Sequence, residues 1–291
     1  MDLDSRADEA AHLRPYAPRL LLEWLHEAPE EPTRVVEGTV VFADISGFTK
    51  LSERLAARGR VGAEELTDAI SRCFEELLAV AYDNGASLLK FGGDATLLLF
   101  TGQDHAVRAC LSAAAMRQAL RDLGPIATSG SSVTLRISMG VHSGEFPFFL
   151  LGESHRELVL TGPSFTQVVD MESTADAGEI VVSPATAAAL PTRSVGRPKG
   201  PGFLLAGGPL VEATTPKVQA LEHLRADVVA RGLSTAVRTH LAAGIDEPEH
   251  RRVTVAFLHF DGTDERIAAS GVTAVAQDLD ALVRRVQESA D

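Results

Sequence analysis

The chain alternates short apolar stretches with longer segments of helical periodicity, and this alternation predicts a domain of mixed strands and helices. Residues 39–45 are mostly apolar and β-branched, which is typical of a buried strand. Helical periodicity follows over residues 51–82, where the apolar side chains gather on one face. The glycines within residues 58–62 predict a break, so we expect two helices there rather than one.

A predicted β-hairpin follows these helices. Residues 87–91 and 96–100 are two short apolar stretches, and Gly92-Gly93-Asp94 lies between them. Glycine at such a position lets the backbone turn tightly. The hairpin would therefore place Asp94 at its turn.

The later part of the main domain continues the same alternation. We expect helices over 106–120, 165–175 and 184–190, a loop over 124–130, strands over 133–141 and 179–182, and a second hairpin from 146–151 and 157–160. With additions, the elements follow the order β-α-β-β-α-β. This order predicts an α+β fold of the ferredoxin-like type.

Changes in composition divide the chain into four expected parts. Residues 1–34 form a leader with one short amphipathic helix, which either packs on the main domain or docks a partner. The main domain covers 35–192, and its end and a linker rich in glycine and proline at its start cover 193–250. Residues 251–291 form the last part, because they repeat the start of the main domain.

This internal repeat is read from the alignment of residues 252–262 with residues 36–47. The matching pairs are Val255 with Val40, Phe257 with Phe42, and Gly262 with Gly47. His259 stands where Asp44 stands in the first copy. A helix-like tail follows to residue 288, so we expect the first strand and helix of an incomplete second domain, with apolar surface left uncovered.

Composition and charge narrow the functional classes. The net charge is −13, no basic stripe is present, and both features argue against a nucleic-acid partner. No apolar stretch approaches the roughly 18 residues that a membrane span needs. Cys73 and Cys110 lie in helix-like segments without metal-ligand spacing, as expected of buried thiols in a reduced, cytoplasmic protein.

The candidate chemistry lies in two aspartates at strand ends. Asp44 ends the first strand before Ser46 and Gly47, and Asp94 lies at the turn of the first hairpin. Two carboxylates at the ends of neighbouring buried strands can hold a pair of divalent cations against a triphosphate. Either aspartate alone could equally be a turn or capping residue.

Residues 42–49 (Phe-Ala-Asp-Ile-Ser-Gly-Phe-Thr) and 90–94 (Lys-Phe-Gly-Gly-Asp) together resemble the motifs of class III adenylate and guanylate cyclases. More narrowly, the chain is similar to the first catalytic half of soluble adenylyl cyclase and of bacterial tandem-cyclase proteins. The resemblance implies conversion of ATP into cyclic AMP and pyrophosphate by two-metal catalysis at a dimer interface. The second cyclase domain would be supplied in cis or in trans. The hairpin also resembles that of diguanylate cyclases, but Ala95-Thr96 replaces their Glu-Phe pair.

The resemblance also implies roles for individual residues. Two Mg²⁺ or Mn²⁺ ions would be bound by the side chains of Asp44 and Asp94 and the main-chain carbonyl of Ile45. The nucleotide would contact these residues together with Ser46, Gly47, Phe48, Thr49 and Arg136. Arg136 could equally be an ordinary surface residue. Lys90 matches a residue of an anion site in the soluble cyclase, and a structural role for it stays open.

The chain departs from the family pattern where the transition state should be stabilised. Thr166 and Asp170 stand where asparagine and arginine are expected, and Val159 stands at the position that reads the purine. An aspartate cannot stabilise negative charge growing on a phosphoryl group. We therefore expect the chain to be inactive without a complementary half; the alternative is a non-catalytic regulatory or interaction module with a cyclase fold.

Overall fold

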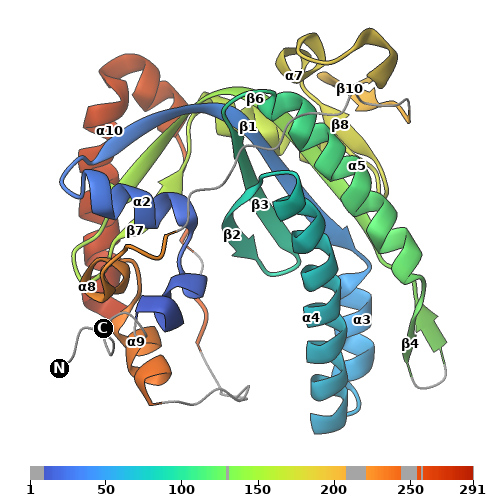
Figure 1. Ribbon diagram of the computed structural model, residues 1–291, viewed down its shortest axis with the longest axis horizontal. Coiled ribbons are helices and arrows are strands. Elements are labelled where there is room, and N and C mark those ends of the chain that lie inside the picture. The colour runs from blue at the N-terminus through green and yellow to red at the C-terminus, as the bar shows by residue number, and fades with distance from the viewer. Residues whose placement is uncertain (1–9, 129–130, 208–220, 244–253, 257, 291) are drawn as a thin grey trace. The chain divides into compact units, whose positions relative to one another are not determined.

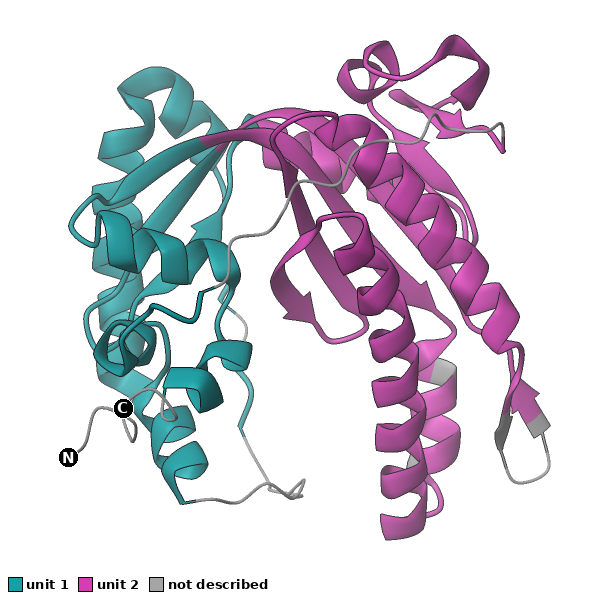
Figure 2. Ribbon diagram, in the orientation of Figure 1, with its two compact units in different colours: residues 1–35, 147–163, 219–291 teal, residues 36–146, 164–218 magenta. Residues whose placement is uncertain are grey.

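The computed structural model describes residues 10–128, 131–207, 221–243, 254–256 and 258–290. The chain divides into two compact units (Figure 2). Unit 1 comprises Met1–Val35, Pro147–Pro163 and Gln219–Asp291, and unit 2 comprises Val36–Phe146 and Ser164–Val218. Strands β1 and β6 are long enough to contribute residues to both.

The main sheet has eight strands among the described residues, in the order β2-β3-β1-β6-β8-β10-β9, with β7 paired to β6 (Figure 1). Its strands are β1 (Thr33–Ser46), β2 (Ser87–Gly92), β3 (Ala95–Thr101), β6 (Arg136–Leu151), β7 (Glu157–Leu160), β8 (Ile180–Val182), β9 (Val195–Lys199) and β10 (Gly202–Leu205). A separate two-stranded sheet pairs β4 (Ile126–Thr128) with β5 (Ser131–Val133).

The helices follow the order of the sequence. They are α2 (Arg19–Glu27), α3 (Phe48–Ala56), α4 (Arg60–Asp83), α5 (His105–Leu123), α6 (Pro163–Thr174), α7 (Pro184–Ala188), α8 (Ala226–Ala230), α9 (Thr235–Ala242) and α10 (Thr263–Ala290), with 3-10 turns η1 (Arg14–Tyr16) and η2 (Thr192–Ser194). Gly59, at φ +64°, separates α3 from α4, so the predicted break in the helix is confirmed.

The core of unit 2 forms because alternate residues of the central strands point to one face. Val41, Ala43 and Ile45 of β1 are buried there, together with the apolar faces of α4 and α5. Figure 1 shows these two helices side by side along the sheet. The opposite face of β1 carries the half-buried Asp44, so this alternation fixes which side of the sheet bears the candidate chemistry.

Unit 1 holds two smaller apolar clusters. Leu22 of the leader helix α2 packs with Val229 and Leu241 of α8 and α9, which lie in the expected linker rather than in the main domain. Phe149 of β6 packs with Leu279 of α10. Polar contacts fix the far end of α10, because the Gln287 side chain accepts from the Glu153 amide at 2.8 Å and donates to the His155 carbonyl at 2.9 Å.

Several predicted elements are confirmed and others are wrong. The strand over 39–45, the glycine hairpin and the mixed α+β class agree with the structure. Residues 133–141 and 146–151 were predicted as separate strands, but 136–151 form the single strand β6. The predicted loop over 124–130 contains β4.

The predicted linker also contains structure, because residues 195–205 form the hairpin β9–β10. Gly200 takes φ +55° at its turn, and β9 tolerates Pro198 because an edge strand can spare an amide. Of the expected strand of the second repeat, the described residues 254–256 and 258–262 belong to no strand. Val255 and Phe260 are exposed there. Phe257 lies outside the described residues.

Candidate active site

The pairing of β1 with β3 brings the two candidate aspartates together. Asp44 is the Cα partner of Ala95, so the hairpin turn that carries Asp94 lies beside the end of β1. The Ile45 amide donates a hydrogen bond of 3.2 Å to the Asp94 carbonyl and fixes the turn there. The two aspartates therefore lie at the same end of adjacent strands.

Their electrostatics show that the two side chains interact. Burial raises the pKa of Asp44 above its ordinary value, and the negative charge of Asp94 raises it further. Such mutual repulsion is relieved when a cation binds between carboxylates. Two aspartate carboxylates and a main-chain carbonyl are hard oxygen donors that suit Mg²⁺ or Mn²⁺. Among the described residues, no cluster of three or more histidine, cysteine, aspartate or glutamate side chains is arranged to hold a metal.

The turn between β1 and α3 requires glycine. Gly47 has φ +96°, and a Cβ atom there would also lie 3.2 Å from the Thr134 carbonyl oxygen. Helix α3 begins at Phe48, and no side chain caps its first turn. The first amides of a helix lack partners inside that helix, so they can donate to an anion.

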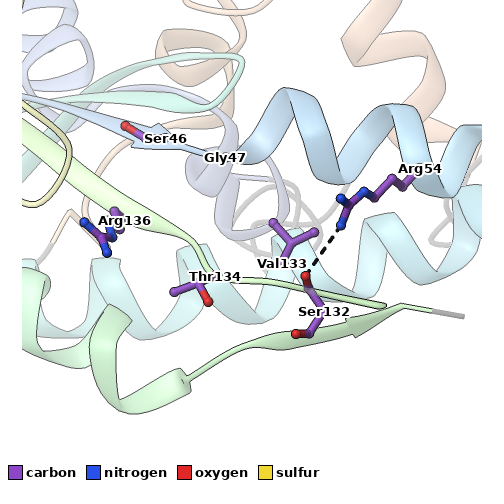
Figure 3. Close-up of a pocket in the computed structure, with 7 residues that line it drawn as sticks. All are labelled: Ser46, Gly47, Arg54, Ser132, Val133, Thr134 and Arg136. Carbon is purple, nitrogen blue, oxygen red and sulfur yellow. Dashed lines mark hydrogen bonds between the residues drawn. The ribbon is translucent and has the colours of Figure 1, made fainter. Parts of the chain in front are cut away.

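A pocket of about 290 Å³ opens beside this turn (Figure 3). It is lined by Ser46, Gly47, Arg54, Ser132, Val133, Thr134 and Arg136. Arg54 donates a long hydrogen bond of 3.5 Å to the Ser132 carbonyl, and Arg136 lies exposed at the start of β6. Two guanidinium groups and a glycine turn give the pocket the chemistry of a site for an anion.

Arg54 is a pocket residue that the sequence analysis did not select. It lies seven residues after Gly47, which is two turns of helix, so both face the same side. That spacing is the signal that could have identified it. Lys90, by contrast, lies exposed on the edge strand β2 and does not line this pocket.

The structure also shows where the three residues that depart from the family pattern lie. Asp170 lies on the exposed side of α6, and Thr166 lies one turn before it. Val159 of β7 packs against the apolar cluster formed by Phe149 and α10 in unit 1. In the structure, Val159 therefore serves packing rather than polar recognition.

Glu172 of α6 is a second residue that sequence analysis missed. Its carboxylate accepts a hydrogen bond of 3.2 Å from the buried Ser138 hydroxyl of β6. Burial raises its pKa, the hydrogen bond from Ser138 opposes that shift, and the charge of Asp44 adds to it. Glu172 thus lies within electrostatic range of the candidate metal site.

Comparisons with known proteins identify the family of the chain. The model of the adenylate and guanylate cyclase catalytic domain matches residues 30–202. Human adenylate cyclase type 10 is 25% identical over 181 residues, which are 60% of this chain and 11% of that protein. The mouse protein of the same name is 23% identical over 162 residues, 54% of this chain and 10% of its own length. The chain therefore spans about a tenth of these curated relatives.

A solved cyclase structure shares the fold. A bacterial light-regulated adenylyl cyclase superimposes with a TM-score of 0.53 at 15% identity, covering 67% of this chain and 60% of that one. The adenylyl cyclase CyaB from P. aeruginosa covers 63% of this chain and 98% of its own, at 25% identity and a TM-score of 0.49. No helix among the described residues is long and apolar enough to span a membrane. Because the family model matches more than half of its length, the chain belongs to the adenylate and guanylate cyclase catalytic domain family.

Proposed function

We propose that this chain is the metal- and nucleotide-binding half of an adenylyl cyclase, which converts ATP into cyclic AMP and pyrophosphate. Turnover would require a complementary second cyclase domain that completes the site at a dimer interface. The observation that carries the proposal is the meeting of Asp44 and Asp94 at one end of adjacent strands, beside the glycine turn. Adenylyl rather than guanylyl activity rests on the curated relatives, which are named adenylate cyclases.

The residues divide the work as follows. Asp44, Asp94 and the Ile45 carbonyl would hold two Mg²⁺ or Mn²⁺ ions. When bound, the ions make the 3′-hydroxyl of ATP a better nucleophile and neutralise charge on the leaving pyrophosphate. The β- and γ-phosphates would accept hydrogen bonds from the amides of residues 46–49, where Gly47 keeps a Cβ atom out of their way.

Positive charge around the pocket supports the same assignment. Arg136 would contact the nucleotide, and Arg54 would add a second guanidinium from α3. The whole chain carries a net charge of −13, so two arginines lining one pocket stand out against an acidic background. We do not extend this role to Lys90, which lies outside the pocket; a separate anion site at Lys90 remains a proposal from the resemblance alone.

The missing functions would come from the second domain. Asp170 cannot stabilise negative charge on the transferred phosphorus, Thr166 replaces the expected asparagine, and Val159 offers no hydrogen bond to a purine. Residues 251–291 are proposed as the start of that domain in cis. Gly271, at φ +79°, breaks α10 much as Gly59 separates α3 from α4. This similarity supports the proposal that α10 repeats the first helices of the main domain, which covers 35–192.

Calorimetric titration of the chain with ATP and Mn²⁺ tests the binding function directly. We expect metal-dependent binding that Asp44→Ala and Asp94→Ala each abolish. Asp83→Asn, an exposed carboxylate at the end of α4, is the matched control and should bind as the wild type does. Absence of metal-dependent binding, or an Asp44→Ala variant that titrates like the wild type, would refute the proposal.

A non-catalytic regulatory or interaction module is the second candidate function. Thr166 and Asp170 favour it, because a domain that never catalyses turnover needs no transition-state residues. The two candidates differ when the chain is assayed with a complementary cyclase domain. The proposal predicts near-background cyclic AMP formation by the chain alone and activity in the mixture, whereas the module would stay inactive in both.

A further inference from the structure

Helix α6 packs against β6 more closely than a side chain would allow. A Cβ atom at Gly140 would lie 2.2 Å from the amide nitrogen of Glu172 and 2.5 Å from the Val168 carbonyl oxygen. Those are backbone atoms, so the helix itself sits over this glycine. The close approach fixes the height of Glu172 above the sheet.

The neighbouring strand places Asp44 on the same face. Strands β1 and β6 are adjacent, and the Leu150 amide donates to the Pro32 carbonyl at 3.0 Å. Further along, the hydroxyl oxygens of Thr39 and Ser143 are 2.7 Å apart. Both contacts fit one antiparallel register.

Continuing this register five residues along β1 places Asp44 opposite Ser138. Residues that are directly opposite in an antiparallel pair point to the same face. The Ser138 hydroxyl donates to the Glu172 carboxylate at 3.2 Å. A serine on β6 therefore lies between the proposed metal ligand and an acid on α6.

Glu172 does not complete a ligand set. The described residues contain no cluster of three acidic, histidine or cysteine side chains arranged around one ion. Its carboxylate instead accepts a hydrogen bond from Ser138, so Glu172 would act on a bound cation through its charge rather than as a ligand. Groups in this position, which orient or polarise the ligands, strongly affect metal affinity in other proteins.

We infer that Glu172 is a positioning residue of the cation site, which strengthens metal binding through its negative charge on the α6 side of Asp44. The inference rests on the proposed function, since it assumes that Asp44 and Asp94 bind the cation. Without metal the additional carboxylate repels Asp44, and with metal bound it attracts the ion. Ser138 contributes by keeping the carboxylate turned toward β6.

The test measures Mn²⁺ affinity without nucleotide, by electron paramagnetic resonance of the free ion at about pH 8, where an ordinary glutamate is ionised. Glu172→Gln keeps the acceptor for Ser138 and removes only the charge. We expect its Kd for Mn²⁺ to rise about tenfold, the lower end of the range for such outer residues. Asp170→Asn removes an exposed charge from the same helix and should change the Kd less than about twofold.

Two further variants separate the possible failures. Asp44→Asn should abolish Mn²⁺ binding; if it does not, the proposed function itself fails. If Asp44→Asn abolishes binding but Glu172→Gln stays within about twofold of the wild type, the role of Glu172 is refuted and the metal site stands. Ser138→Ala keeps the charge but releases the carboxylate, so we expect a smaller loss of affinity, and a Kd equal to that of the wild type would contradict the orienting role of Ser138.

Discussion

Substituting Gly140 with alanine tests the contact on which the arrangement of α6 depends. The added Cβ atom would approach two backbone atoms of the helix, at 2.2 Å for the Glu172 nitrogen and 2.5 Å for the Val168 oxygen. Ordinary contacts begin near 3.4 Å, so the helix would have to move by about 1 Å. Overpacking of this kind costs about 1–3 kcal/mol, and we expect about 3 kcal/mol because backbone cannot rotate out of the way.

The expected result is a less stable protein with a weakened metal site. For a domain of this size, a loss of about 3 kcal/mol lowers the melting temperature by about 6–12 °C. Urea denaturation followed by circular dichroism measures the free energy of unfolding, and an unchanged m-value would show that the unfolded state is unaffected. The Kd for Mn²⁺ should rise in the same variant, because Glu172 moves with the helix.

Gly144→Ala is the matched control on the same strand. Its Cβ atom would meet only side-chain atoms, the His142 Nε2 at 3.1 Å and the Ser164 Oγ at 3.5 Å, and these can turn aside. We expect less than about 1 kcal/mol of destabilisation. If Gly140→Ala proved as stable as this control, α6 would not pack on β6 as described, and the reasoning about Glu172 would fail with it.

Three other properties follow from burial. Burial lowers the pKa of His142 and of His105, so protonation of either ring disfavours the folded state; their contribution to stability is present above about pH 6.5 and declines as the pH falls below it. His142→Asn should therefore flatten the fall in melting temperature between about pH 6.5 and 5. Leu279→Ala removes a buried side chain from the cluster of unit 1, should cost about 2–3 kcal/mol locally, and should speed limited proteolysis of α10. Burial raises the pKa of Cys73 to about 11 and of Cys110 to about 12, so neither thiol should react with Ellman's reagent before unfolding, and rapid labelling of the native protein would contradict this.

The sequence predicts the elements whose patterns are local. Residues 39–45 are mostly apolar and β-branched, and Gly92-Gly93 provides the backbone freedom that a tight turn needs, so β1 and the hairpin were predictable. The hairpin β9–β10 was not predictable, because Pro198 in its edge strand and Gly200 at its turn are residues typical of a linker. Strand β10 is stabilised by pairing with β8, and a local sequence pattern does not reveal this contact between separate segments.

The same distinction applies to the candidate site. Asp44 and Asp94 could be selected because each ends a recognisable strand beside glycine. Glu172 could not be selected from the sequence, because its position depends on the close packing of α6 over Gly140, and no local sequence pattern predicts that packing. Arg54 is intermediate. Its helical spacing from Gly47 predicts which side of α3 it faces, but its place in the lining of the pocket is known only from the structure.

The acidic character of α6 explains why one domain of this kind would not suffice. Glu172 and Asp170 place two carboxylates on α6, the helix on which the family resemblance asks for an asparagine in place of Thr166 and an arginine in place of Asp170. The charge of Glu172 would favour cations at Asp44, whereas a carboxylate at Asp170 opposes the negative charge that grows on the transferred phosphorus. One acidic helix cannot both support cation binding and stabilise the transition state, so we expect these two functions on opposite halves of a site. A pair of identical chains would repeat the acidic helix on both sides, and only a partner with a different helix at that position would supply the missing positive charge.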